Sequence, residues 1–248
     1  MLRRALGKAL DVVTLLVFVL LLPVQKLMHR FSRVGDHPFF DNATFPWAPG
    51  IEADWRDVRT ELDQVLRHVD DIPNFQDISE ENRALTNDEH WKTFFFRAWG
   101  VPIASNCARC PHTAALIDRI PGATSAFFSI LGPRKHLPAH RGPYAGVLRY
   151  HLGLKVPDPT ACRIRVADQI GHWREGASLI FDDTFEHEVW NDTDAVRVVL
   201  FVDILRPLPA PLAALNGLII RLVRHSSLVK PGLEKFKAWD ERLARAWR

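Results

Sequence analysis

The sequence predicts a mainly β domain, a sandwich or barrel, with helices before and after it. Six short segments between residues 125 and 205 have strand character, and turn residues such as Gly-Pro, Pro-Asp-Pro and Asn-Asp-Thr-Asp separate them. Strands that are this short and closely spaced favour a sandwich or barrel over a βαβ sheet. The length of 248 residues and the hydrophobic fraction of 47% suit one sizeable core, and they exclude global disorder, collagen and coiled coil.

The chain begins with a hydrophobic segment. Residues 12–24 carry no charge, and basic residues flank them on both sides. This run is shorter than the roughly 20 apolar residues of a membrane-spanning helix, and it lacks the small residues of a signal-peptide cleavage site. We expect residues 1–33 to be a retained membrane anchor, in the form of a tilted span, a partly inserted helix or a hairpin arm. A buried helix of the domain is the alternative.

Helices and then strands are expected in the middle of the chain. Apolar residues at helical spacing predict a helix over 54–69 and a short one over 113–119. The predicted strands are 125–131, 146–154, 162–166, 177–181, 187–190 and 196–205.

Two basic amphipathic helices are expected over residues 208–248. The apolar positions are Leu212, Leu215, Ile219, Leu222 and Val223 in the first helix, and Phe236, Trp239, Leu243 and Trp247 in the second. A basic face opposite an apolar face with tryptophans is typical of a helix that lies in a membrane interface. The same stripe can instead pack on its own domain, and both alternatives remain open.

Charge is distributed unevenly along the chain. Residues 1–33 carry six basic and one acidic side chain, and residues 205–248 carry nine basic and three acidic ones. Since the whole chain has a net charge of +3, residues 34–204 have a net charge of −8. A nucleic-acid-binding protein would carry positive charge on its folded domain, whereas basic ends beside apolar segments suit an anionic membrane. We therefore expect a membrane partner, no nucleic acid and no obligate protein partner.

Arginines occur within two predicted strands. Side-chain alternation places Arg149 and His151 on one face of residues 146–154, and it places Arg197 on the same face as Asp203. A buried arginine is costly unless it meets an anion. An internal ion pair explains one such residue, whereas two on separate strands favour bidentate binding of a small dicarboxylate.

Two of the five histidines in the β-rich part are candidate metal ligands. We expect His140 to follow a turn and His187 to begin a strand, and a barrel can bring such positions together at its mouth. Pairs of imidazoles are typical of Fe(II) oxygenases, whose usual site adds a carboxylate from a His-x-Asp motif. Here the motif reads His140-Arg141-Gly142, so that carboxylate is missing.

Three motifs now point to a family. They read HRGPYAGVLRYHLGL at 140–154, WREGASLIFDDTFEHEVW at 173–190 and RVVLFVD at 197–203. In this order and spacing they resemble the aspartyl/asparaginyl β-hydroxylase family of Fe(II)/2-oxoglutarate dioxygenases, including its bacterial lipid A acyl-chain hydroxylases. A weaker resemblance reaches back to residues 91–99 and 110–113. The resemblance implies a double-stranded β-helix, or jelly roll, over residues 34–207, with Fe(II) as cofactor and 2-oxoglutarate and O₂ as cosubstrates.

The resemblance also implies a ligand set for the metal. His140 and His187 would bind iron. Glycine at position 142 matches the branch that hydroxylates peptides, whereas the lipid hydroxylases carry aspartate there. Asp183 matches an acid of the peptide branch that lies near the metal and orients water. The metal site thus resembles one branch, and the membrane flanks resemble the other.

The same resemblance implies how 2-oxoglutarate binds. Arg197 and Ser129 would hold its distal carboxylate, while Arg149 and His151 would lie at its oxalyl end beside the metal. The implied reaction couples oxidative decarboxylation of 2-oxoglutarate to hydroxylation of an unactivated C–H bond.

The membrane flanks and an aromatic cluster at 91–99 favour an acyl chain of a membrane lipid, lipid A or an aminolipid, as the substrate. Hydroxylation of Asp or Asn in a peptide is the second interpretation. A catalytically inactive β scaffold that binds a membrane partner is the third. Three cysteines are too few for a disulfide-stapled fold, and free thiols, iron and 2-oxoglutarate indicate a reducing compartment. We expect the inner membrane, with the catalytic domain facing the cytoplasm.

Overall fold

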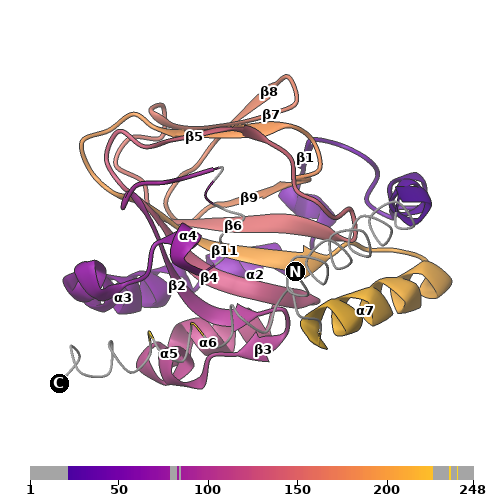
Figure 1. Ribbon diagram of the computed structural model, residues 1–248, viewed down its shortest axis with the longest axis horizontal. Coiled ribbons are helices and arrows are strands. Elements are labelled where there is room, and N and C mark those ends of the chain that lie inside the picture. Colours follow the sequence, from indigo (N-terminus) through magenta and orange to yellow (C-terminus); the bar gives the residue numbers. More distant parts are fainter. Residues whose placement is uncertain (1–21, 79–82, 84, 226–234, 236–238, 240–248) are drawn as a thin grey trace, which may run out of the picture.

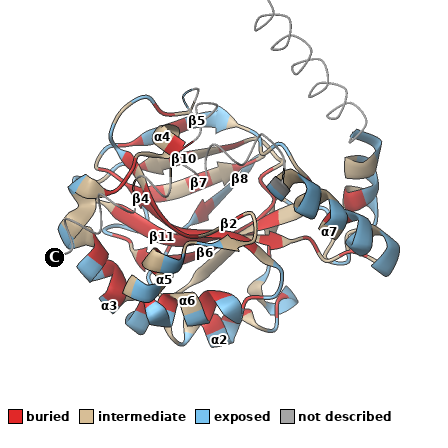
Figure 2. Cartoon of the chain, turned by 60° about the horizontal axis from the view of Figure 1, so that its bottom comes forward, coloured by how far each residue is buried: buried red, intermediate tan, exposed pale blue. Residues whose placement is uncertain are grey.

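The computed structural model of the protein describes residues 22–78, 83, 85–225, 235 and 239. Two antiparallel sheets face each other, and helices cover the outer face of the larger sheet (Figures 1 and 2). In spatial order, the larger sheet consists of β1 (Phe39–Phe40), β9 (Ser178–Phe181), β6 (Val147–Lys155), β11 (Arg197–Leu205), β4 (Ala123–Leu131), β2 (Trp91–Ala98) and β3 (Val101–Pro102). The smaller sheet consists of β5 (His136–His140), β10 (His187–Asn191), β7 (Cys162–Val166) and β8 (Gln169–His172).

The helices lie before, between and after the strands. They are the 3₁₀ helices η1 (Asn42–Thr44) and η2 (Leu66–Asp71) and the α-helices α2 (Ala48–Glu52), α3 (Trp55–Val65), α4 (Phe75–Ile78), α5 (Ala104–Arg109), α6 (Pro111–Asp118) and α7 (Ala210–His225). Residues 22–30 are helical as well. The Glu61 carboxylate of α3 accepts hydrogen bonds from the main-chain N–H groups of His112 and Thr113, both at 2.8 Å. These bonds satisfy two donors at the start of α6 that have no partner within that helix.

Side-chain alternation divides the core into two layers. Leu148, Tyr150 and Leu152 of β6 pack in the layer between the larger sheet and the helices. His151 points the other way, where its ring contacts Phe201 in the layer between the two sheets. The alternation predicted for β6 and β11 is confirmed. Its consequence is that the polar residues of both strands face the space between the sheets.

The six strands predicted from the sequence are all present, and their ends lie within two residues of the expected positions. Strands β1, β2, β3, β5 and β8 were missed. Strand β2 is buried on both faces, so its aromatic run shows no alternation. Strand β5 contains Pro138, which is tolerated because β5 lies at the edge of its sheet. The expectation that His140 follows a turn was wrong, since His140 is the last residue of this strand.

The predicted helices are present with changed ends. The helix expected over 54–69 consists of α3 and η2, and a kink at His68 lies within η2. The helix expected over 113–119 is α6, whose Pro111 stands in the first turn, where its missing N–H costs no hydrogen bond.

Both ends of the chain are described only in part. Residues 1–21, most of the predicted anchor, lie outside the described residues, and 22–24 belong to the helix at 22–30. Within the part of the chain that the structure describes, no helix is long and apolar enough to cross a membrane. The first predicted C-terminal helix is α7. The second lies outside the described residues except for Lys235 and Trp239.

Candidate functional site

Two histidines face each other where β5 ends and β10 begins. His140 and His187 are directly paired in the antiparallel register, and their ring centroids lie 4.0 Å apart. The Nδ1 atom of His140 lies 2.7 Å from the carbonyl oxygen of Pro138, and that of His187 lies 3.0 Å from the carbonyl oxygen of Phe185. A carbonyl only accepts, so each Nδ1 carries the proton and each Nε2 keeps a lone pair. Among the described residues, the buried Nε2 of His187 has no partner, so the pair is a candidate metal site.

The missing carboxylate of the His-x-Asp motif has a local counterpart. A Cβ atom at Gly142 would lie 1.8 Å from Oδ2 of Asp183. The N–H of Gly142 also donates to the carbonyl oxygen of Asp183 at 2.6 Å. The carboxylate of Asp183 therefore occupies the space that a side chain at position 142 would need. Asp183 belongs to the loop between β9 and β10. Its carboxylate is therefore distant from His140 in the sequence, but it lies where the third residue of the His-x-Asp motif would place one.

Arg149 connects Asp183 to a second acid, the partly buried Asp203. Its Nη2 atom lies 2.8 Å from Oδ2 of Asp183, and its Nε atom lies 3.7 Å from Oδ1 of Asp203. Burial raises the pKa of Asp183, and it raises the pKa of Asp203 to about 6. The Arg149 guanidinium opposes both shifts because it favours the charged carboxylates. One cation is therefore shared by two acids beside the histidine pair.

A buried guanidinium that pairs with no carboxylate among the described residues lies in the same layer. Arg197 is 2% exposed, and its Nε and Nη1 atoms have no partner among the described residues. Its guanidinium lies 4.3 Å from the ring of Trp173. Burial lowers the pKa of Arg197 to about 10, so the group remains charged at neutral pH. A buried charge of this kind is costly without a counter-ion, so Arg197 is a candidate group for binding an anion.

Ser129 and His151 lie on the same face as Arg197. Ser129 on β4 is paired with Val199, two residues from Arg197, and its hydroxyl accepts a hydrogen bond of 3.0 Å from Nε1 of Trp91. Neither ring nitrogen of His151 has a partner among the described residues. Burial lowers the pKa of His151 well below its ordinary value, and the nearby arginines add to the shift. A neutral imidazole and a hydroxyl therefore accompany the guanidinium.

The structure gathers the predicted residues in three groups. His140 lies with His187, Arg149 pairs with Asp183, and Arg197, Ser129 and His151 share one face of the larger sheet.

Trp91, Trp173 and Asp203 were not predicted as site residues, but they contact Ser129, Arg197 and Arg149, respectively. Alternation had placed Asp203 on the correct face of its strand, so a signal for that residue was available. The indole of Trp91 gave no comparable signal, because β2 was not recognised as a strand.

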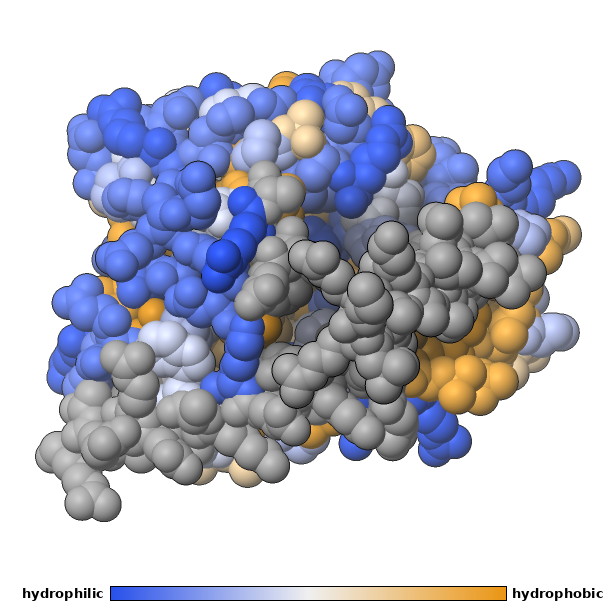
Figure 3. Space-filling view, in the orientation of Figure 1, coloured by the Kyte–Doolittle hydropathy of each residue, from blue (hydrophilic) through white to orange (hydrophobic). Residues whose placement is uncertain are grey.

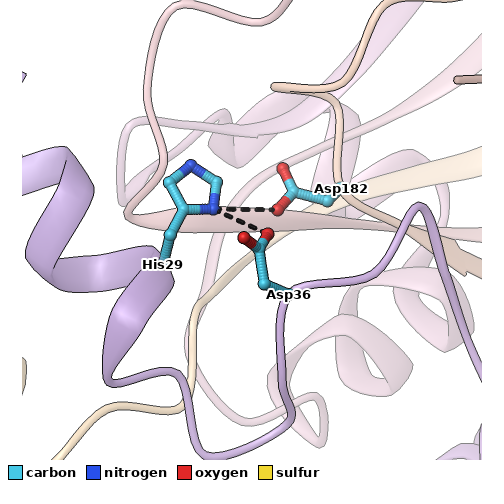
Figure 4. A group of neighbouring side chains, drawn as sticks. All are labelled: His29, Asp36 and Asp182. Atoms are coloured by element: carbon cyan, nitrogen blue, oxygen red, sulfur yellow. Dashed lines mark hydrogen bonds and ion pairs between the residues drawn. The ribbon is translucent and has the colours of Figure 1, made fainter.

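A second cluster of polar side chains includes Asp182, the neighbour of Asp183 in the loop after β9. Figure 4 shows His29, Asp36 and Asp182, whose ligand atoms all lie within 4.8 Å of one another. Nδ1 of His29 lies 2.9 Å from Asp36 and 3.8 Å from Asp182. Asp182 is fully buried and also pairs with the fully buried Arg206. The contacts of His29 and the ion pair between Arg206 and Asp182 therefore account for this cluster, which ties the helix at 22–30 to the loop after β9.

The stability of the metal-free protein is expected to fall as the pH drops below about 6.5. Burial lowers the pKa of His187 to about 3, and it also lowers the pKa values of His140 and His151. The unfolded chain binds these protons near pH 6.5, whereas the folded chain does not. The stability that these groups contribute is thus present above pH 6.5 and is lost toward lower pH, by up to about 1.4 kcal/mol per pH unit for each group.

Asp183 and Asp203 oppose this trend. Their raised pKa values favour the folded state at acidic pH, and this contribution is lost as the pH rises through about 6 for Asp203. Urea unfolding in a chelator between pH 5 and 8 measures the balance, and three histidines against two acids predict a net loss on acidification. A His151→Phe variant is expected to show a shallower slope than the parent protein. Equal slopes would contradict the buried, neutral state of His151.

The family profile and two relatives that match the chain are all described as hydroxylases. A sequence profile described as aspartyl/asparaginyl beta-hydroxylase matches residues 52–207. The chain is 48% identical over 219 residues to an ornithine lipid ester-linked acyl 2-hydroxylase of Rhizobium tropici, across 88% of this chain and 78% of that protein. It is 34% identical over 162 residues to the aspartyl/asparaginyl beta-hydroxylase of Homo sapiens, across 63% of this chain and 21% of that protein.

Among solved structures, a cupin domain from Bordetella pertussis aligns with 34% of this chain and 94% of its own, with 16% identity and a TM-score of 0.27. The profile match includes all seven predicted site residues, from Ser129 to Arg197.

Proposed function

Because the chain belongs to the aspartyl/asparaginyl β-hydroxylase family, we propose that it is an Fe(II)- and 2-oxoglutarate-dependent hydroxylase of an acyl chain in a membrane lipid. An aminolipid of the ornithine-lipid type is the first candidate substrate. One observation carries the proposal: the facing imidazoles of His140 and His187 lie in the same inter-sheet layer as the uncompensated guanidinium of Arg197. Placement at the inner membrane, facing the cytoplasm, is part of the proposal.

The residues present fit an iron ion. His140 and His187 offer two Nε2 lone pairs, because main-chain carbonyls fix the protons on both Nδ1 atoms. Asp183 has an Oδ1 atom without a partner among the described residues, which suits it to orient water beside the ion. When bound, iron with O₂ would supply the oxidising chemistry that converts a C–H bond to C–OH while 2-oxoglutarate becomes succinate and CO₂.

The residues present also fit 2-oxoglutarate. The planar fork of Arg197 matches a carboxylate, and the hydroxyl of Ser129 on the neighbouring strand adds a hydrogen-bond donor. Arg149 and His151 lie on β6, which flanks β11 on the side opposite to β4; they pair with Asp203 and Phe201 of β11 and would meet the oxalyl end. Arg197 offers this dianion a charge that no carboxylate among the described residues neutralises, and Arg149, which also pairs with Asp183 and Asp203, offers a second cation. The apolar side chains of the inter-sheet layer exclude water from the same space.

The lipid substrate is favoured by the extent of the similarity. The relative named as a lipid acyl hydroxylase shares 48% identity across 88% of this chain, which goes beyond the region matched by the profile. The relative named as a peptide-modifying enzyme shares 34% across 63%. Two proteins that bind their substrates in the same way are expected to be similar outside the dioxygenase core as well.

The test is hydroxylation by the purified protein supplied with Fe(II) and 2-oxoglutarate. We expect mass spectrometry to show one added oxygen atom in the acyl chain of an ornithine lipid, with matching release of succinate. A His187→Ala variant is expected to lose both products. His136→Ala is the matched control, because His136 is 45% exposed and pairs with Glu188 on the outer face.

The other outcomes separate the remaining interpretations. Oxygen added to an aspartate-containing peptide but not to lipid would support the second interpretation and contradict ours. Absence of succinate with every substrate, and in the substrate-free uncoupled reaction, would favour an inactive scaffold.

A further inference from the structure

Exposed apolar side chains concentrate on two helices. They are Leu22, Leu27 and Phe31 at the helix of residues 22–30, with exposures of 53%, 43% and 50%, and Leu215, Leu218 and Leu222 of α7, with exposures of 36%, 50% and 63%. We call these six residues the two-helix surface. Among the described residues, the one other large apolar side chain that is exposed is Ile170 of β8. Figure 3 shows a large hydrophobic area at the position that α7 has in Figure 1.

The two helices form one firmly attached unit. Met28 of the first helix packs in one apolar cluster with Leu212 and Ile219 of α7. Asn216 of α7 donates to the carbonyl oxygen of Gly146 at 2.7 Å, and Gln25 accepts from the N–H of Ala145 at 3.0 Å. Both helices lie at the same end of the molecule in Figures 1 and 2. The exposed leucines therefore belong to a fixed surface of the domain.

The charge of the same helices is exclusively positive. Residues 22–33 contain Lys26, Arg30 and Arg33, residues 210–225 contain Arg221 and Arg224, and neither range contains Asp or Glu. Basic groups beside exposed leucines match a bilayer with anionic headgroups, in which apolar side chains enter the acyl boundary and cations remain among phosphates. The sequence before Leu22 continues the apolar character, since residues 12–21 carry no charge.

The helix at 22–30, which carries half of the two-helix surface, contacts the loop that carries Asp183. Nε2 of His29 lies 3.5 Å from Oγ1 of Thr184, and Nδ1 lies 3.8 Å from Asp182. These two residues flank Asp183 in the sequence. Arg141, next to His140, donates to the carbonyl oxygen of Thr184 at 3.2 Å. The helix at 22–30 thus contacts the loop of residues 182–184 directly, and that loop in turn contacts Arg141 beside His140.

We propose that the two-helix surface docks on an anionic lipid bilayer and places the Asp183 loop next to the membrane, where an acyl chain reaches the site. The nature of that acyl substrate rests on the proposed function. Docking itself depends only on the six apolar residues and the basic residues of the same helices. The occupant is a lipid surface, because uniform positive charge around a leucine patch complements anionic headgroups and repels a second copy of the same surface.

The test measures the depth of single side chains in the full-length protein. Cys107→Ser removes the partly exposed thiol, and Leu27→Cys, Leu218→Cys and Leu222→Cys each receive an environment-sensitive fluorophore. Ile170→Cys is the matched control, because Ile170 is 51% exposed on β8, outside the two-helix surface. On phosphatidylglycerol vesicles with nitroxide-labelled acyl chains, quenching at positions 27, 218 and 222 is expected to exceed quenching at 170 about fivefold or more, since interfacial helices bury their apolar face in the acyl boundary.

Two outcomes would overturn the proposal. One is equal quenching at positions 218, 222 and 170 in vesicle-bound protein. The other is shielding of the fluorophores at positions 218 and 222 that increases with protein concentration when no lipid is present. That result would assign the surface to a second copy of the chain. The fluorescence does not depend on turnover. Deep burial of the labels without lipid hydroxylation would therefore support docking and contradict the proposed function. Hydroxylation of detergent-dispersed lipid without burial of the labels would support the proposed function and contradict docking.

Discussion

An Arg197→Lys variant is expected to need about a hundredfold more 2-oxoglutarate for half-maximal turnover, because truncating one partner of a buried charge pair costs about 2–5 kcal/mol. Arg197 is 2% exposed, lies over the Trp173 ring and has two nitrogen atoms without partners among the described residues. A lysine ammonium keeps the charge, but it cannot reproduce the planar fork that meets both oxygens of a carboxylate. Steady-state succinate release against 2-oxoglutarate concentration gives the value.

The matched control is Arg134→Lys. Arg134 pairs with Asp194 at the surface, where both side chains are mostly exposed, so the same chemical change is expected to leave turnover unaltered. The His140 and His187 pair is untouched in both variants, and anaerobic titration with Co(II) is expected to give parental metal affinity. An unchanged requirement for 2-oxoglutarate in Arg197→Lys would remove Arg197 from the cosubstrate site.

The inward direction of the site residues was predictable because a strand has a strict period of two. That period placed Arg149 and His151 opposite the apolar residues of 146–154, and the structure shows the same division between two core layers. It also placed Arg197 with Asp203 on β11. Residue pattern alone was sufficient here because each of these strands has one face toward the helices and one toward the second sheet.

Contacts between distant strands were not predictable in the same way. Trp91 reaches Ser129 from β2, a strand that is buried on both faces and therefore lacks a readable period. His140 lies within an edge strand whose proline and polar residues resemble a turn. The pairing of His140 with His187 is a matter of register, which the sequence of either strand does not encode by itself.

The position of Asp183 is the clearest case of information that only the fold contains. Sequence spacing shows that Gly142 lacks a carboxylate and that an acid precedes His187 by four residues. It does not show that the acid fills the space at Gly142. That fact requires the loop after β9 to return beside the end of β5, and the 2.6 Å hydrogen bond from Gly142 to Asp183 records this approach.

A Gly142→Asp variant is expected to lose metal affinity by about 10- to 100-fold, the range that follows from disturbing groups around metal ligands. The family resemblance implies aspartate at this position in the lipid hydroxylases, so the exchange looks conservative from the sequence alone. In this structure the new Cβ would lie 1.8 Å from Oδ2 of Asp183, and two carboxylates would compete for one space and for Arg149. Overpacking and like charge would displace the His140 strand.

The decisive variant therefore combines Gly142→Asp with Asp183→Gly. It removes the clash, keeps one carboxylate beside the histidine pair and leaves Arg149 with one acid to neutralise in this space. We expect it to bind Co(II) at least about tenfold more tightly than Gly142→Asp alone, since a His-x-Asp carboxylate completes the usual ligand set. Asp183→Gly alone is the control for the loss of the native acid, and thermal unfolding checks that each variant folds. If the combined variant bound metal no better than Asp183→Gly, a carboxylate from position 142 could not replace Asp183, and the spatial equivalence of the two positions would be wrong.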